Sequence, residues 1–326
     1  MRKLIRIFFF GMLLMSVLAL AGVAWMFSMR PGLESYQAHR HPDSAAATGP
    51  ALSASWFGTT AVLLSDDKSS IFIDPFFTRP GGWRELMLNR PIAPDEALIE
   101  SWLKKAGVDR LDAVLVTHSH YDHSMDAGVV TRLTGATLLG SESTANVGRG
   151  GDLPETQIVV SKPGKPYHYG SFTITFLKSR HTGATGGRPV GDITQPLVPP
   201  ARYIDYRQGG TYAVLIEHRL GTVLHHGSAG WLPGMYQGRH ADVVFLGIAA
   251  TPALGDYFAN VVDPTTATRV IPTHWDDFTR PLDQPLLPLP FGVDLDGFFE
   301  DSARLRPQLK VLTLEPGRRV ILFPNN

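Results

Sequence analysis

The stretch VLVTHSHYDHSMD, residues 114–126, gathers side chains that are well suited to binding metal ions. His118, His120, Asp122 and His123 lie within six positions, and they include three of the twelve histidines in this chain of 326 residues. Imidazole nitrogen and carboxylate oxygen are good ligands for zinc and related ions. The alternating His118 and His120 can point to one centre, and Asp122 and His123 can reach a second centre close by. The spacing therefore predicts part of a two-metal site.

A strand and a helix are expected to hold this cluster in place. Residues 111–117, LDAVLVT, form a short apolar run that is typical of a buried strand. Residues 124–135 predict a helix that Ser124 caps and Gly135 ends. The cluster then lies in a loop at the carboxyl end of a strand, where functional residues are often found.

The rest of the chain beyond residue 50 predicts a mixed α/β fold. Two apolar runs flank a polar turn at residues 65–70 and predict a hairpin, and residues 94–107 predict a helix that Gly107 ends. From residue 157 the chain is rich in predicted strands, with further helices expected near 257–262 and 296–305. Two halves of strands with flanking helices are typical of an α/β sandwich.

The hexapeptide HSHYDH resembles the His-x-His-x-Asp-His signature of the metallo-β-lactamase superfamily, and the resemblance covers about residues 52–323. It implies a four-layer αβ/βα sandwich with the metals at one edge. It also implies that Asp74, in IFIDPFF, holds the metal loop without itself binding metal. By the same resemblance, three residues bind one metal and three bind the other: His118, His120 and His181, and Asp122, His123 and His274.

Ser228 departs from this family pattern. It lies in HHGSAGW, at the position where relatives usually carry an aspartate that bridges the two metals. A serine hydroxyl is a poor zinc ligand at neutral pH, so we expect hydroxide to be the sole bridge and one metal to bind more weakly. His225 and His226 are expected at the end of a strand near the site. The expected cofactors are two divalent ions, and this donor set favours zinc.

The flanking sequence suggests a branch of the superfamily. IDPFF, and THWDDFTRPLDQP around His274, are similar to the branch that holds ascorbate-phosphate lactonases and N-acyl-phosphatidylethanolamine phospholipase D. The chain is thus expected to hydrolyse an ester, a lactone or a phosphodiester, and lipid-like molecules are among the expected substrates. One alternative is an exported β-lactamase with a six-ligand dizinc site and Ser228, although RHTGATGG lacks the turn expected around His181. A non-catalytic metal-binding module and a flavodiiron-like redox enzyme are further alternatives.

A metal pair lowers the pKa of bound water and so supplies hydroxide for such a hydrolysis. Asp122 binds one metal and could also orient this nucleophile. A metal-bound water, His226 or Tyr203 could protonate the leaving group. The loop 184–208 follows His181 directly and contains four prolines, so it is expected to border the site and select the substrate.

The N-terminus predicts a membrane anchor at residues 1–30. Arg2, Lys3 and Arg6 precede 23 uncharged residues, 7–29, which is enough for a spanning helix. A cleaved signal peptide, cut near residues 22–24, is the alternative. Residues 31–50 predict a tether and residues 51–326 the metallo-hydrolase domain, on the non-cytoplasmic side of the membrane. Net charge near zero argues against a nucleic-acid partner, and the absence of cysteine excludes thiolate ligands.

Overall fold

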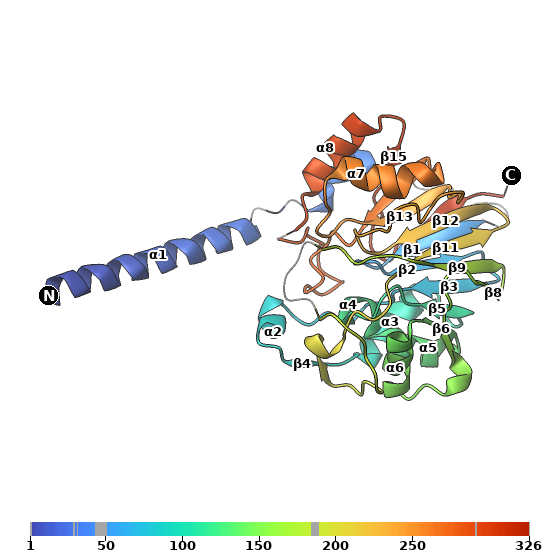
Figure 1. Ribbon diagram of the computed structural model, residues 1–326, viewed down its shortest axis with the longest axis horizontal. Coiled ribbons are helices and arrows are strands. Elements are labelled where there is room, and N and C mark those ends of the chain that lie inside the picture. Colours follow the sequence, from blue (N-terminus) through green and yellow to red (C-terminus); the bar gives the residue numbers. More distant parts are fainter. Residues whose placement is uncertain are drawn as a thin grey trace.

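The computed structural model describes residues 2–28, 30, 32–42, 51–183, 189–290 and 292–325. Helix α1 (Arg2–Ser28) projects away from a rounded domain that contains all the other described elements (Figure 1). Its segment Ile5–Trp25 has a mean hydropathy of 2.5 and is 0% buried, so by length and composition it is a candidate membrane span. The helix thus agrees with the predicted anchor in position and length.

The domain is built around two seven-stranded sheets that face each other. The order of strands in the first sheet is β16-β1-β2-β3-β5-β6-β7. Its strands are β1 (Leu52–Trp56), β2 (Val62–Ser65), β3 (Ser70–Ile73), β5 (Ala113–Leu115), β6 (Thr137–Gly140), β7 (Ile158–Val160) and β16 (Arg319–Phe323). Strand β16, the last in the chain, pairs antiparallel with β1, so the C-terminal segment completes the first sheet.

The order of strands in the second sheet is β15-β14-β13-β12-β11-β9-β8. Its strands are β8 (Pro166–Tyr169), β9 (Phe172–Lys178), β11 (Tyr212–His218), β12 (Gly221–His226), β13 (Val243–Gly247), β14 (Arg269–Thr273) and β15 (Lys310–Val311). Side chains from both sheets, such as Phe72, Val114, Ile174 and Phe245, are fully buried in one continuous core. This packing fixes how the two sheets lie on each other.

Helices cover the outer side of each sheet (Figure 1). Helices α3 (Glu96–Lys105), α5 (Ala127–Thr134) and α6 (Glu142–Gly150) lie on the side of the first sheet, and α7 (Leu254–Tyr257) and α8 (Leu295–Leu305) on that of the second. A π turn over Phe258–Val262 continues α7. The predicted four-layer αβ/βα sandwich is therefore confirmed.

The expected helix ends are partly right. Helix α3 begins after Asp95, whose side chain accepts a hydrogen bond from the backbone N–H of Leu98, and a left-handed Gly107 follows it. Gly135 ends α5 as predicted. The prediction that Ser124 caps this helix is wrong. Ser124 is the last residue of a separate short helix, α4 (Tyr121–Ser124), and its hydroxyl donates back to the carbonyls of Ser119 and His120.

The predicted tether differs from the structure over its described part. Residues Leu33–His39 form a short 3-10 helix, and Tyr36 is buried against Phe299 of α8. The hydroxyl of Tyr36 donates to Asp296, 2.8 Å away. An aromatic contact and a partly buried hydrogen bond thus hold this segment against the domain. Residues 43–50 lie outside the described residues.

Loops that leave strands at one edge of the sandwich carry the candidate site residues. Strands β3 and β5 run parallel, as do β12, β13 and β14, and β9 has the same direction as β12 because both are antiparallel to β11. The carboxyl ends of these strands therefore lie at one edge. This topology brings together residues that are up to 200 positions apart in the sequence: Asp74, His118, His181, Ser228 and His274.

Candidate metal centre

The loop that follows β5 is buried and is held to neighbouring segments by hydrogen bonds. His118 and Ser119 leave the strand, and His120 stands at the start of α4. The hydroxyl of Ser119 lies 3.0 Å from that of Thr144 in α6, and the backbone N–H of Ser119 donates to the carbonyl of Gln208. These contacts fix the backbone from which the histidines project.

A first cluster joins three histidines. His118, His120 and His181 each offer a ring nitrogen, and the three nitrogens lie within 4.8 Å of one another. The Nε2 of His118 is 3.1 Å from the Nδ1 of His120. Burial, together with the neighbouring histidines, lowers the pKa of His118 well below its usual value, so this ring is neutral. A neutral ring with a lone pair in a group of nitrogens suits a metal ion.

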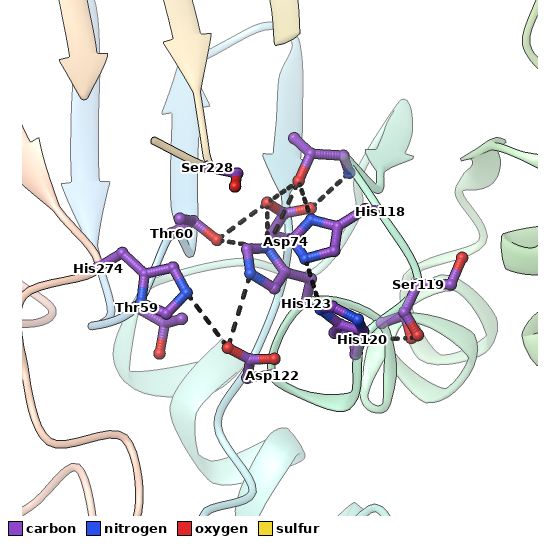
Figure 2. A network of polar contacts seen from close by, with 12 residues as sticks. Thr59, Thr60, Asp74, His118, Ser119, His120, Asp122, His123, Ser228 and His274 are labelled. Atoms are coloured by element: carbon purple, nitrogen blue, oxygen red, sulfur yellow. Dashed lines mark hydrogen bonds and ion pairs between the residues drawn. The ribbon is translucent and has the colours of Figure 1, made fainter. Parts of the chain in front are cut away.

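A second cluster joins Asp122, His123 and His274. The Oδ2 of Asp122 lies 3.6 Å from the Nε2 of His123 and 3.3 Å from the Nε2 of His274, and Figure 2 shows both rings turned toward the carboxylate. The Nε2 of His123 is buried without a hydrogen-bond partner. When Nδ1 carries the proton, the lone pair of Nε2 faces the negatively charged carboxylate of Asp122, and the two repel each other. A cation between them would remove this repulsion. Both clusters consequently fit divalent metal ions.

Asp74 sets the orientation of His123. Its carboxylate accepts hydrogen bonds from the backbone N–H and hydroxyl of Thr117, both at 2.7 Å, and from the hydroxyl of Thr60 at 2.9 Å. The Nδ1 of His123 donates to the same carboxylate at 2.9 Å (Figure 2), which leaves Nε2 for a metal. This arrangement supports the predicted role of Asp74, and it adds Thr60 and Thr117, which the sequence gave no reason to single out.

Buried charges in the second cluster stabilise one another. Burial alone would raise the pKa of Asp122, but His123 and His274 hold it below the usual range. Burial alone would lower the pKa of His123, but Asp122 and Asp74 raise it above its usual value. The carboxylates are thus ionised and able to bind a cation.

Left-handed backbone conformations occur at two residues of the site. Asp74 has a φ of 47° and His274 has a φ of 57°. Such conformations cost on the order of 1 kcal/mol or more in a residue with a side chain and are common at functional sites. The backbone N–H of His274 donates to the carbonyl of Thr59 at 2.7 Å, and the N–H of Thr59 donates to Asp276 at 2.6 Å. Asp276 also forms a fully buried ion pair with Arg79, so it fixes the loop that carries His274.

Ser228 lies beside the clusters but makes a structural contact. Its hydroxyl accepts from the backbone N–H of Thr182, 3.1 Å away, next to His181. Gly230 approaches the backbone of His181 so closely that an added Cβ would come within 2.6 Å of it. The turn after β12 therefore fixes the position of His181. Whether Ser228 leaves one metal site weak stays a prediction.

His225 and His226 lie at the end of β12, as expected, and both are fully buried. The Nε2 of His225 donates to the carbonyl of Thr60 at 2.8 Å. Burial lowers the pKa of His226 to about 3, and its ring contacts Tyr236. His226 is absent from the residues that line the cavity beside the clusters. Its position therefore does not favour the predicted role as a proton donor to a leaving group, whereas Tyr203 does line that cavity.

A cavity of about 430 Å³ opens onto both clusters. Its walls are mostly apolar and come from several separate parts of the chain. The lining residues are Trp83, Leu86, Met87, His120, Tyr121, Asp122, His181, Thr182, Pro189, Tyr203, Ser228, Ala249, Ala250, His274, Phe278, Leu289 and Gly292. Pro189 and Tyr203 belong to the loop predicted over residues 184–208, so the described part of this loop does border the site. Residues 184–188 lie outside the described residues.

Part of that loop forms structure that the sequence did not predict. Strand β10 (Ala201–Arg202) pairs with β4 (Pro91–Ile92), just after the short helix α2 (Trp83–Met87). Ile193 and Tyr206 are buried in a small apolar cluster with Phe76 and Leu86. These two residues thus stabilise the wall, and Tyr203 is the loop aromatic that faces the cavity.

Comparisons with known proteins agree with this fold and site. The sequence profile of the metallo-beta-lactamase superfamily matches residues 54–247. A UPF0173 metal-dependent hydrolase from Myxococcus xanthus is 28% identical over 286 residues, 85% of this chain and 86% of the relative. Another from Pyrobaculum islandicum is 25% identical and covers 68% of this chain and 84% of its own.

Solved structures show the same fold at low sequence identity. Igni18, a metallo hydrolase from Ignicoccus hospitalis, has a TM-score of 0.55 and 20% identity, covering 82% of this chain and 97% of its own. An isothiocyanate hydrolase from Delia radicum gut bacteria has a TM-score of 0.53 and 16% identity, and the match covers 84% of this chain and 100% of the hydrolase. The chain belongs to the metallo-β-lactamase superfamily, and it is a metal-dependent hydrolase. The narrower branch suggested by IDPFF and THWDDF stays a prediction.

Proposed function

We propose that the two clusters form one dinuclear metal centre, most suited to zinc, that hydrolyses an ester, lactone or phosphodiester bond in a substrate with an apolar part. The observation that carries this proposal is the position of the clusters. Both open into the same cavity, whose walls are mostly apolar. Ligands of this type are usual for zinc, and apolar walls with a few polar groups are usual for small-molecule sites.

The protein side chains have separate tasks in this proposal. His118, His120 and His181 hold one ion, and Asp122, His123 and His274 hold the other. Such ions supply Lewis-acid activation of water and of the scissile bond. Asp122, through the oxygen that is not directed at the histidines, orients the attacking water. Asp74 keeps the proton of His123 on Nδ1, and Asp276 holds the loop of His274 through Thr59.

Tyr203 is the proposed proton donor to the leaving group. It lines the cavity, and its ring packs edge-on against Tyr121, 6.2 Å between centroids. Tyr121 and Phe278 form the adjoining aromatic wall, where their rings are also 6.2 Å apart. A hydroxyl beside an aromatic wall can hold the apolar part of a substrate and donate a proton near the scissile bond.

We also propose that α1 anchors the protein in a membrane, with the domain on the non-cytoplasmic side. The support is the exposed apolar helix and the basic residues Arg2, Lys3 and Arg6 at its N-terminal end. A C-terminal reporter that is active only outside the cytoplasm would agree with this topology. Reporter activity confined to the cytoplasm would refute it, and a mature form that starts near residue 25 would indicate a cleaved signal peptide instead.

An activity screen tests the enzymatic proposal. The full-length protein, purified in detergent and loaded with zinc, would be assayed against lactones, phosphodiesters, N-acyl phospholipids and β-lactams. We expect hydrolysis in one of the first three classes and loss of at least a thousandfold in His118→Ala. An exposed histidine variant, His168→Ala, is the matched control because His168 lies on β8 and is absent from both clusters.

The screen also separates the alternatives. Hydrolysis of β-lactams alone would identify the protein as a β-lactamase, which is the alternative that Ser228 suggests. Tight metal binding without hydrolysis of any class would favour a non-catalytic module. Failure to bind metal at all would refute the proposed centre.

A further inference from the structure

The exposed apolar side chains of the domain are concentrated around the cavity. Outside α1, the large hydrophobic residues that are exposed in the described part of the chain are Met87, Leu88, Val160, Val190 and Val198. Met87 and Leu88, 82% and 53% exposed, are neighbours at the end of α2. Val190 and Val198 lie on the loop that contributes Pro189 and Tyr203 to the cavity. Only Val160, on β7, lies elsewhere.

These side chains come from two segments that are joined to each other. Strand β4, which follows α2, pairs with β10, which follows Val198. Met87 itself lines the cavity while most of its side chain faces outward. We call α2 with Leu88, together with residues 189–198, the apolar rim. The cavity therefore reaches the surface where the domain is most apolar.

A buried ion pair holds Arg30, the second residue after the apolar helix, beside this cavity. Arg30, which only Met29 separates from the last residue of α1, donates to Asp277 at 2.8 Å and to the carbonyl of Pro288 at 2.9 Å. The side chains of Arg30 and Asp277 are 9% and 2% exposed. The next residues in the chain, Phe278 and Leu289, both line the cavity. Arg30, two positions after the end of α1, is thus held beside the cavity wall.

The position of α1 relates the rim to the proposed membrane. Helix α1 leaves the domain from the same end at which α2 lies, and it runs away from that end (Figure 1). A bilayer that contains α1 would therefore cover the face of the domain that carries α2. Apolar side chains beside a membrane anchor can enter the boundary between headgroups and acyl chains.

We infer that the apolar rim docks onto the bilayer that holds α1, so that the cavity opens at the membrane surface and admits lipid-like substrates from it. The inference rests on the membrane anchor proposed above. Beyond the anchor, the inference specifies which residues contact the lipid and from which side the substrate enters. It also assigns to the Arg30–Asp277 pair the role of setting the orientation of the domain on the membrane. Burial of this pair would make the orientation of the domain on the membrane fixed rather than free.

The absence of cysteine allows a direct test with single labels. Met87→Cys, Leu14→Cys and His168→Cys would each carry one environment-sensitive fluorophore, in full-length protein reconstituted in phosphatidylcholine–phosphatidylglycerol vesicles. Leu14 lies in the middle of α1, and His168 is an exposed residue of β8, at the far end of the domain from α1 (Figure 1). Nitroxide-labelled lipids would report contact with the bilayer by quenching.

We expect the labels at positions 87 and 14 to shift to the blue and to lose most of their emission to the nitroxide lipids, and the label at 168 to do neither. An aqueous label at 14 would refute the anchor and the inference together. A quenched label at 14 with an unquenched label at 87 would refute the inference alone. A blue shift at 87 without lipid quenching would indicate contact with another protein copy and would also overturn it.

A second variant tests the ion pair. Arg30→Gln in the Met87→Cys background should reduce quenching at 87 at least twofold and leave quenching at 14, measured in the Leu14→Cys background, unchanged, because the domain can then turn relative to the helix. Equal quenching at 87 with and without Arg30 would overturn the role of the pair in setting the orientation.

Discussion

Replacement of Asp74 by Asn should weaken one metal selectively. In the native protein the carboxylate of Asp74 accepts a hydrogen bond from the Nδ1–H of His123, at 2.9 Å, and so leaves Nε2 free of a proton. An amide that keeps its oxygen toward the backbone N–H of Thr117 turns its NH₂ group to His123. Nδ1 must then accept, the proton moves to Nε2, and the metal loses a ligand. Asn tolerates the left-handed backbone of position 74, so strain does not confuse the result.

The size of the effect can be bounded in both orientations of the amide. With the NH₂ toward His123, loss of this support should cost about 10–100-fold in metal affinity, or roughly 1.4–2.8 kcal/mol. With the NH₂ toward Thr117, two donors face each other at a distance that the native structure sets at 2.7 Å, and an unmade buried hydrogen bond costs about 1–3 kcal/mol of stability. The effect of either orientation should be measurable. The first orientation lowers metal affinity directly, and the second lowers the stability of the fold.

Metal content after dialysis against a graded chelator is the assay. We expect Asp74→Asn to lose one equivalent at about 10–100-fold lower chelator strength than the native protein. The metal at His118, His120 and His181 should persist longer. Asp66→Asn is the matched control, because Asp66 is also a buried turn aspartate that contacts a histidine, His218, at 3.2 Å. Coincident curves for native protein and Asp74→Asn would refute the assignment.

Three further outcomes are expected. Ser228→Asp should tighten the more weakly held metal and Ser228→Ala should change metal affinity little, as measured by the same dialysis; a large loss of metal in Ser228→Ala would identify the serine as a ligand. Arg79→Met should lower the free energy of unfolding by about 3–5 kcal/mol because it leaves the buried Asp276 without its partner, whereas Arg132→Met, at an exposed ion pair, should cost about 1 kcal/mol or less in denaturant unfolding. Tyr203→Phe should lower kcat with metal content unchanged, and equal kcat values would remove Tyr203 as the proton donor.

The two clusters of candidate ligands could be predicted because most of their residues are close together in the sequence. Four of the six residues lie in HSHYDH, and His181 and His274 each follow a recognisable strand. The order of these landmarks, together with the resemblance that it revealed, was enough to predict the sandwich and the two clusters. The contacts of Asp74 with Thr60 and Thr117 could not be predicted, because threonines in strands and turns have no special spacing.

Other features depended on contacts between distant segments. The prediction of a tether was wrong over residues 33–39, because Tyr36 packs against Phe299, which lies more than 250 positions later in the sequence. Ser124 looked like a helix cap, but α4 begins before it and its hydroxyl turns back to His120. The apolar cavity wall could not be predicted either, since Trp83 and Phe278 meet only in the folded chain, with 5.9 Å between ring centroids.

Charge at the proposed centre narrows the kind of substrate that it favours. Two divalent ions would carry four positive charges, and the buried carboxylates in contact with the ligand histidines are Asp122 and Asp74. Ser228 adds no charge where a bridging aspartate would add one. The positive excess would lie in a buried site, where charges interact more strongly than in water. An anionic group, such as a phosphodiester or the carboxylate formed from a lactone, would offset it, while the apolar walls would hold the uncharged part. Phosphodiesters with an acyl chain combine both properties, and they are therefore the first substrates to assay.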